Sequence, residues 1–124
     1  MTVDAGPPDG PGQERFADGK ISGEGTYEGG QRTGPWTFWH RNGQLKASGV
    51  YVHGELDGPW VWHRENGHFL QQGAFRAGVQ TGPWVRYAPT GEPMERGQFV
   101  DGRRVGEWVR LAPDGTVTRT TRHL

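Results

Sequence analysis

Short runs of aromatic and β-branched residues alternate with polar residues along the chain, and steps rich in Gly, Pro and Asn separate the runs. Residues 58–63, for example, read GPWVWH, and residues 82–87 read GPWVRY. Such alternation is typical of β-strands, because successive side chains of a strand point to opposite faces of the sheet. No segment as long as an ordinary helix lacks Gly or Pro, so we expect an all-β fold.

The pattern recurs every 24 residues, with opening glycines at Gly10, Gly34, Gly58, Gly82 and Gly106. At fixed distances after them stand a Trp, a Gly and a Tyr or Phe, which form three structural columns: Trp36, Trp60, Trp84, Trp108; Gly49, Gly73, Gly97; and Tyr27, Tyr51, Phe75, Phe99. A strict internal period indicates an array of one small unit. The period divides the chain into a flexible Gly/Pro-rich leader, residues 1–9, and five repeats, residues 10–33, 34–57, 58–81, 82–105 and 106–124.

Each repeat is predicted to form a β-hairpin around a step such as Asn42-Gly43. Asn-Gly favours a two-residue type I′ turn, because both central residues of that turn need a positive φ. This turn would pair Trp36 with Gly49 and place the ring over the glycine of its own hairpin. A second reversal, at steps such as His53-Gly54, leads into the next repeat. The expected fold is an elongated, single meandering antiparallel sheet of about ten strands, a β-solenoid of stacked β-hairpins.

Side-chain alternation assigns the residues to two faces of this sheet. One face would carry the three columns together with Leu45, Phe69 and Val117. The other face would carry the valines and bulky residues that stand between them: Val61, Val85, Val109, Trp39, His63, Tyr87 and Leu111. The first face is the more regular, so we expect it to be the packed one. The proline after most opening glycines should lie at a strand start or a sheet edge, because it lacks an N–H donor.

Composition and charge narrow the function. Only 31% of the residues are hydrophobic, so the aromatic side chains must supply most of the buried area. The net charge is zero, with 8 acidic and 5 basic side chains in residues 1–57 and 6 acidic and 9 basic ones in residues 58–124. Arginines among aromatics in the second half are a feature of proteins that bind single-stranded nucleic acid. Acidic residues dilute them and the chain is neutral, so no nucleic-acid partner is expected.

Side chains that carry chemistry form no catalytic pattern. The chain has no Cys, and its two serines, Ser22 and Ser48, lie outside a nucleophile motif. The five histidines occupy unrelated places in the repeat: His40, His53, His63, His68 and His123. We therefore expect no enzyme, no catalytic residue, no metal and no cofactor. No apolar run is long enough to span a bilayer and residues 1–12 do not resemble a signal peptide, so a cytoplasmic location is expected.

The succession of Gly-x-Trp, Asn-Gly, Gly-x-Tyr/Phe and x-Gly over residues 16–118 resembles the MORN repeat. It is most similar to the bacterial variant found in YwqK-like proteins, which carry an antitoxin label. This resemblance implies a rod of stacked hairpins that binds proteins or serves as a scaffold, and in some eukaryotic relatives associates with membranes. The antitoxin label implies a soluble partner of a toxin.

These observations predict a non-catalytic protein-binding module that acts as a scaffold, a regulatory subunit or an antitoxin-like partner of a toxin or effector encoded nearby. Residues that vary between repeats while the Trp column stays fixed are the expected contacts: Phe38, Trp39, Trp62, His63, Arg86, Tyr87 and Arg110. Two alternatives stay open, association with membrane phospholipid and binding of carbohydrate or cell wall through Trp. Edge pairing of the terminal hairpins would give homo-oligomers.

Overall fold

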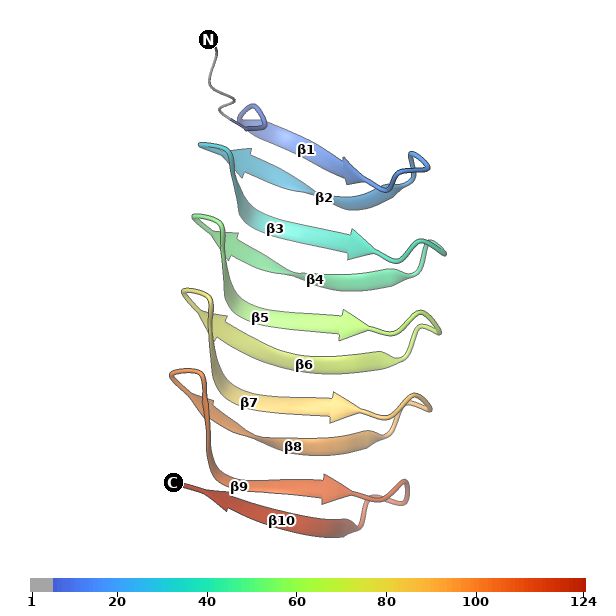
Figure 1. The fold of residues 1–124 in the computed structure, drawn as a ribbon, viewed down its shortest axis with the longest axis vertical. Coiled ribbons are helices and arrows are strands. Elements are labelled where there is room, and N and C mark those ends of the chain that lie inside the picture. The colour runs from blue at the N-terminus through green and yellow to red at the C-terminus, as the bar shows by residue number, and fades with distance from the viewer. Residues whose placement is uncertain (1–5) are drawn as a thin grey trace.

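A computed structural model describes residues 6–124, which form one open antiparallel sheet with its ten strands in sequence order (Figure 1). The strands are β1 (Gly10–Arg15), β2 (Ile21–Glu28), β3 (Gln31–Trp39), β4 (Leu45–Val52), β5 (Glu55–His63), β6 (Phe69–Arg76), β7 (Val79–Tyr87), β8 (Pro93–Val100), β9 (Arg103–Leu111) and β10 (Val117–His123). The predicted all-β meander is confirmed. Of the predicted leader, residues 1–5 lie outside the described residues, and Asp9 accepts a hydrogen bond from Gly29 N.

The turn at Asn42-Gly43 differs from the predicted type I′ turn. At Asn42-Gly43 the loop holds three residues, because His40 N donates to Gln44 O and Gly43 N donates to His40 O. Only the glycine of this loop has a positive φ, 88°, so a type I turn followed by a glycine bulge replaces the expected type I′ turn. The type I′ geometry instead occurs at the second reversal, where His53 and Gly54 have φ of 48° and 81°.

The three-residue loop shifts the strand register and moves three apolar residues to the other face. Phe38 pairs with Ala47, but its neighbour Trp39 pairs with Leu45, so one residue of β4 is bulged out. A shift by one residue exchanges the two faces of a strand. The assignment of Leu45, Phe69 and Val117 to the Trp face was therefore wrong, since each lies beside a residue of the opposite face: Trp39, His63 and Leu111.

Each Trp ring packs on the hairpin before its own, which corrects a second expectation. Trp36 and Gly49 are register partners, as predicted. The ring of Trp36, however, covers Gly25, where an added Cβ would stand 2.3 Å from Trp36 Cδ2. Trp36 Nε1 also donates a hydrogen bond of 3.0 Å to Thr26 O. The Trp column thus joins consecutive repeats.

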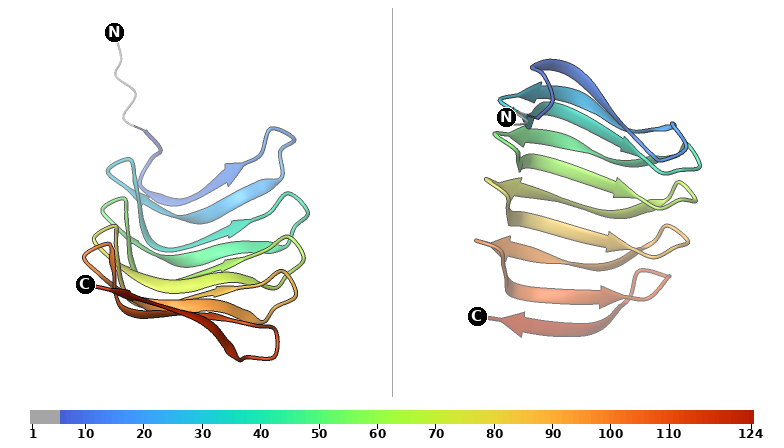
Figure 2. Two further views of the ribbon diagram at one scale, coloured as in Figure 1. Left: turned by 60° about the horizontal axis from the view of Figure 1, so that its bottom comes forward. Right: turned by 45° about the horizontal axis from the view of Figure 1, so that its top comes forward.

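The strands bend at a bulge that lies just before each Trp of the column. Glu24 pairs with Thr37 and Thr26 with Thr33, so a single glycine, Gly25, faces residues 34–36. Pro35 lies at this bulge inside β3, and not at a strand start or sheet edge as predicted, because the bulge removes the need for its missing N–H. Similar register shifts recur between later repeats. The strands are curved along their length, and the sheet forms an open trough (Figure 2).

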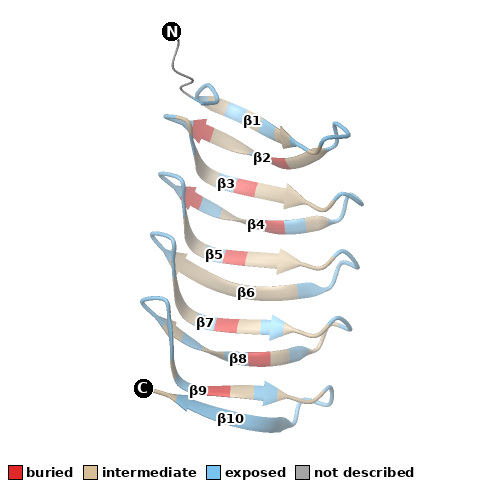
Figure 3. Cartoon of the chain, viewed as in Figure 1, coloured by how far each residue is buried: buried red, intermediate tan, exposed pale blue. Residues whose placement is uncertain are grey.

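Buried residues lie on the face that carries the Trp column, which confirms the predicted packed face. The apolar core consists of Tyr27, Trp36, Ala47, Tyr51, Trp60, Trp84 and Trp108. A buried position recurs at the same place in β3, β5, β7 and β9 (Figure 3). Strand β10 is almost wholly exposed, and its Thr121 stands opposite Trp108 as predicted.

Candidate binding groove

The Trp face is the concave side of the trough. Residues six apart in an extended strand are roughly 20 Å from each other. Arg32 and Phe38 are six apart in β3, yet the Arg32 guanidinium carbon lies 5.0 Å from the centre of the Phe38 ring. Such a contact requires the strand to curve around these side chains. We call the space that they line the concave groove.

At its N-terminal end the concave groove is filled by the chain's own side chains. Arg32 donates two hydrogen bonds to Glu14, from Nε at 2.9 Å and from Nη2 at 2.6 Å, and its guanidinium lies 5.2 Å from the Trp36 ring centre. Tyr27 donates its hydroxyl to the same carboxylate at 2.6 Å. The hydrogen bonds from Arg32 lower the pKa of Glu14, and burial together with the bond to Glu14 raises the pKa of Tyr27. The charges of Glu14 and Arg32 at this end are therefore paired with each other.

The middle of the concave groove is aromatic. Trp62 stacks between Trp60 and Trp84, with 5.8 Å between ring centres on each side, and meets Phe75 edge to face. Phe38 occupies the equivalent place between Trp36 and Trp60. The rings therefore form one continuous stack that runs across the repeats.

At the C-terminal end cations replace the aromatic rings. Arg86 and Arg110 stand where the preceding repeats carry Phe38 and Trp62. Glu95 is only 8% exposed and accepts hydrogen bonds from Arg104 at 3.3 and 3.4 Å, while Arg110 approaches it to 3.7 Å. The Arg104 guanidinium carbon also lies 4.0 Å from the Trp108 ring centre. A cavity of about 370 Å³ opens here, lined by Gln71, Gln80, Trp84, Arg86, Phe99, Arg104 and Trp108.

The predicted contact residues are divided between the two faces of the sheet. Phe38, Trp62, Arg86 and Arg110 line the concave groove, because each follows a Trp column residue by two positions. Trp39, His63 and Tyr87 lie on the convex face, where Phe69 bridges two of them with ring centres 4.9 Å from His63 and 5.4 Å from Tyr87. These seven residues cannot form one contact surface, and their role in binding stays a prediction.

Sequence reasoning did not single out Gln71, Gln80 and Arg104, which line the same cavity as Arg86. Gln80 and Arg104 stand two residues before an opening glycine, in the column that also holds Arg32 and Leu56. Variation within this column was the available signal. This variation affects the groove only because the strand bends at each opening glycine. The bend brings the side chains of the column over the residues that follow the Trp.

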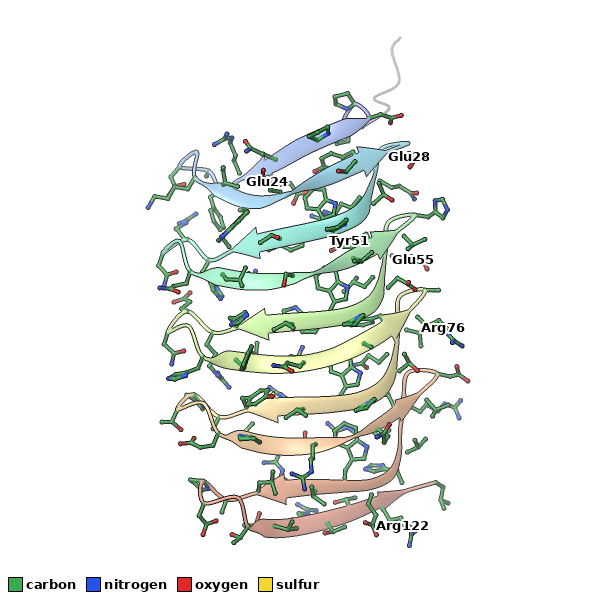
Figure 4. The ribbon with its side chains drawn as sticks, turned by 180° about the vertical axis from the view of Figure 1, so that it is seen from behind. Glu24, Glu28, Tyr51, Glu55, Arg76 and Arg122 are labelled. Atoms are coloured by element: carbon green, nitrogen blue, oxygen red, sulfur yellow. The ribbon has the colours of Figure 1, made fainter. Side chains whose placement is uncertain are left out.

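Charged side chains also line the side of the sheet where the two-residue turns join the strands, among them Glu28, Glu55 and Arg76 (Figure 4). All three are exposed. Within residues 6–124 no group of three or more His, Asp or Glu side chains is arranged to hold a metal. The same part of the chain contains no helix with the length and apolarity to cross a membrane.

The chain was compared with protein families, curated proteins and solved structures. The chain is similar to a chain in a crystal structure of a GtfA/B complex bound to UDP and GlcNAc, with 13% sequence identity and a TM-score of 0.35. That similarity covers 94% of this chain and 23% of the other. No curated protein matches. The family model described as "MORN repeat variant" matches residues 32–53, which run from β3 into the turn after β4, so this segment of the all-β array is similar to a MORN repeat variant.

Proposed function

We propose that the chain is a non-catalytic protein-binding module and that its partner lies in the concave groove. One observation carries the proposal. The buried Trp column is constant from repeat to repeat, whereas the groove residues two positions later change from Phe38 and Trp62 to Arg86 and Arg110. A constant scaffold with variable residues on a concave surface is how repeat arrays present a binding site. Aromatic residues and Arg are also enriched at protein interfaces.

The concave groove offers what an extended partner needs. Its aromatic stack leaves Phe38 and Trp62 only partly covered, and its C-terminal cavity adds polar donors beside Trp84 and Phe99. Apolar contacts with a few placed polar groups are the usual make-up of a recognition site. A toxin or effector as this partner, the YwqK-like antitoxin role and a cytoplasmic location stay predictions. So do the phospholipid and carbohydrate alternatives and edge pairing through β1 and β10.

The test compares capture by the two faces of the sheet. Three purified baits are placed in the native host's lysate: the wild-type chain, Arg86→Glu in the concave groove and Arg96→Glu on the convex face of β8. The captured proteins are identified by mass spectrometry. We expect a protein that wild type and Arg96→Glu retain and that Arg86→Glu loses. A captured set that Arg96→Glu loses and Arg86→Glu keeps would move the interface to the convex face. Capture of no protein by the wild type would refute a protein-binding role.

A further inference from the structure

Four arginines and one carboxylate lie on the concave side of the C-terminal strands. Within the described strands β7–β10 the groove-facing cations are Arg86, Arg104, Arg110 and Arg119, and the one groove-facing acid is Glu95. Four positive charges and one negative charge leave an excess of three. A concave surface with one sign of charge attracts ligands of the other sign. At the N-terminal end, by contrast, Glu14 neutralises Arg32.

Arg86 and Arg119 are the two cations of this excess that have no partner among the described residues, and of these two Arg86 lines the cavity. It stands opposite Glu95 in the β7–β8 register. The Glu95 carboxylate is engaged from the other side by Arg104 and Arg110, with N···O distances of 3.3 and 3.7 Å. Among residues 6–124, no hydrogen bond, ion pair or ring contact engages the Arg86 side chain. Glu95 therefore orders two of the four arginines and leaves Arg86 free for a ligand in the cavity.

The surroundings of Arg86 add donors and an apolar wall. Gln71 stands opposite Arg86 in the β6–β7 register, and Gln80 lines the same cavity. Neither amide side chain has a hydrogen-bond partner among the described residues. Trp84, Phe99 and Trp108 form the apolar part of the lining. A cavity of about 370 Å³ is large enough for a carboxylate side chain and an apolar neighbour.

The N-terminal end of the same groove displays the contact that such a ligand would make. There Arg32 holds Glu14 through two nitrogens at 2.6 and 2.9 Å while its guanidinium lies over aromatic rings. Bidentate Arg–carboxylate pairs are among the stronger hydrogen-bonded contacts in proteins. The cavity offers the same components in another arrangement, because Arg104 stands in the repeat column of Arg32 and the free Arg86 stands in the column of Glu14. The excess of positive charge and the free guanidinium therefore favour a carboxylate.

We propose that the C-terminal half of the concave groove recognises an acidic segment of the protein partner, and that Arg86 binds an Asp or Glu carboxylate while Trp84 and Phe99 hold an adjacent apolar side chain. This inference rests on the proposed function and names the chemistry of its partner. The segment is a peptide and not a free anion, because the aromatic wall beside the cations matches an acidic residue next to an apolar one.

The experiment uses a fluorescein-labelled peptide of alternating glutamate and leucine, with an alternating glutamine and leucine peptide as its control. Fluorescence anisotropy measures binding to the full chain at low salt. We expect the glutamate peptide to bind and Arg86→Gln to weaken it about tenfold, the loss of one bidentate contact. Arg86→Lys should restore part of the affinity, because a single ammonium keeps the charge but not the paired geometry.

Arg96→Gln is the matched control, because Arg96 is exposed on the convex face of the neighbouring strand β8. It should leave peptide affinity unchanged, and thermal unfolding checks that all three variants fold. Equal binding of the glutamate and glutamine peptides, or equal loss in Arg86→Gln and Arg96→Gln, would overturn the proposal. Inorganic phosphate is the competitor. If phosphate displaces the peptide at a concentration as low as that of the free peptide, the cavity is a general anion site and the proposal is overturned.

The two proposals fail separately. If Arg86→Glu loses a lysate partner while the glutamate peptide never binds, the concave groove remains the interface and the acidic segment is wrong. If the peptide binds through Arg86 but no lysate protein depends on the groove, the carboxylate site stands and the protein-binding role is wrong.

Discussion

The indole ring of Trp60 in β5 lies on the backbone of Gly49 in β4, so close that an added Cβ at Gly49 would stand 2.2 Å from Trp60 Cδ2. Trp60 is 2% exposed and its Nε1 donates a hydrogen bond of 3.0 Å to Val50 O. One side chain therefore joins two hairpins through both packing and a hydrogen bond. This contact is the means by which a chain with few aliphatic residues holds its repeats together.

Gly49→Ala is expected to lower the free energy of unfolding by about 2–3 kcal/mol, because the methyl group displaces a ring that has no space to move into. Urea unfolding followed by Trp fluorescence measures the change. Ser48→Ala, on the convex face of the same strand, should change stability by less than about 0.5 kcal/mol. In a Trp60→Phe background the smaller ring leaves room, so the cost of Gly49→Ala should fall. An unchanged cost there would show that the clash with the ring is not the cause.

The two groove tryptophans of β5 should rank differently in stability. Trp60→Ala removes a buried ring that crosses to the preceding hairpin and should cost about 3–5 kcal/mol. Trp62→Ala removes a half-buried ring that stacks on Trp60 and Trp84 and should cost about 1–2 kcal/mol. Thermal unfolding by circular dichroism compares them. Equal costs would mean that Trp62 belongs to the core as fully as Trp60 does, and would leave it no role reserved for a partner.

The period of the sequence predicted the strand number, the order of the strands and the pairing of Trp36 with Gly49. It could not predict the loop at Asn42-Gly43, because Asn-Gly suits both a two-residue turn and a three-residue loop that ends in glycine. For this reason the prediction placed Leu45 on the concave face, whereas it lies on the convex face. The sequence also marked Arg86 and Arg110 as contacts. It missed Arg104, because only the bend at each opening glycine brings residues six apart in one strand to the same site.

Ala77 provides a test of the type I′ turns. It adopts a φ of 49°, a conformation that an L side chain tolerates poorly, and its N–H donates to Asp57 Oδ1 at 3.2 Å. Ala77→Gly should relieve the strain, keep that hydrogen bond and raise stability by about 0.5–1 kcal/mol. Chemical denaturation measures the gain. Ala74→Gly, within β6, should instead lower stability by roughly 1 kcal/mol, because glycine gains no steric relief in a regular strand. Destabilisation of similar size in both variants would contradict a strained turn.

The pair of Glu14 and Arg32 should make stability depend on acid. Hydrogen bonds from Arg32 hold the pKa of Glu14 below its ordinary value of 4.5, so the folded state favours the ionised carboxylate. The contribution is complete above about pH 4.5 and is lost as the pH falls through the lower, folded pKa, because the unfolded chain binds the proton first. Both side chains are partly exposed, so about 1 kcal/mol is expected.

Glu14→Gln should lower stability by that amount at neutral pH and reduce its decline from neutral pH to about pH 3, because no proton then distinguishes the two states at this position. Urea midpoints at a series of pH values measure both effects. Glu24→Gln, exposed on the convex face of β2, is the matched control and should preserve the wild-type pH dependence. The stability of Glu14→Gln could instead fall with pH as steeply as that of wild type, while the stability of Glu24→Gln falls less. That result would place the acid sensitivity outside the groove and show that Arg32 keeps its position without the Glu14 carboxylate.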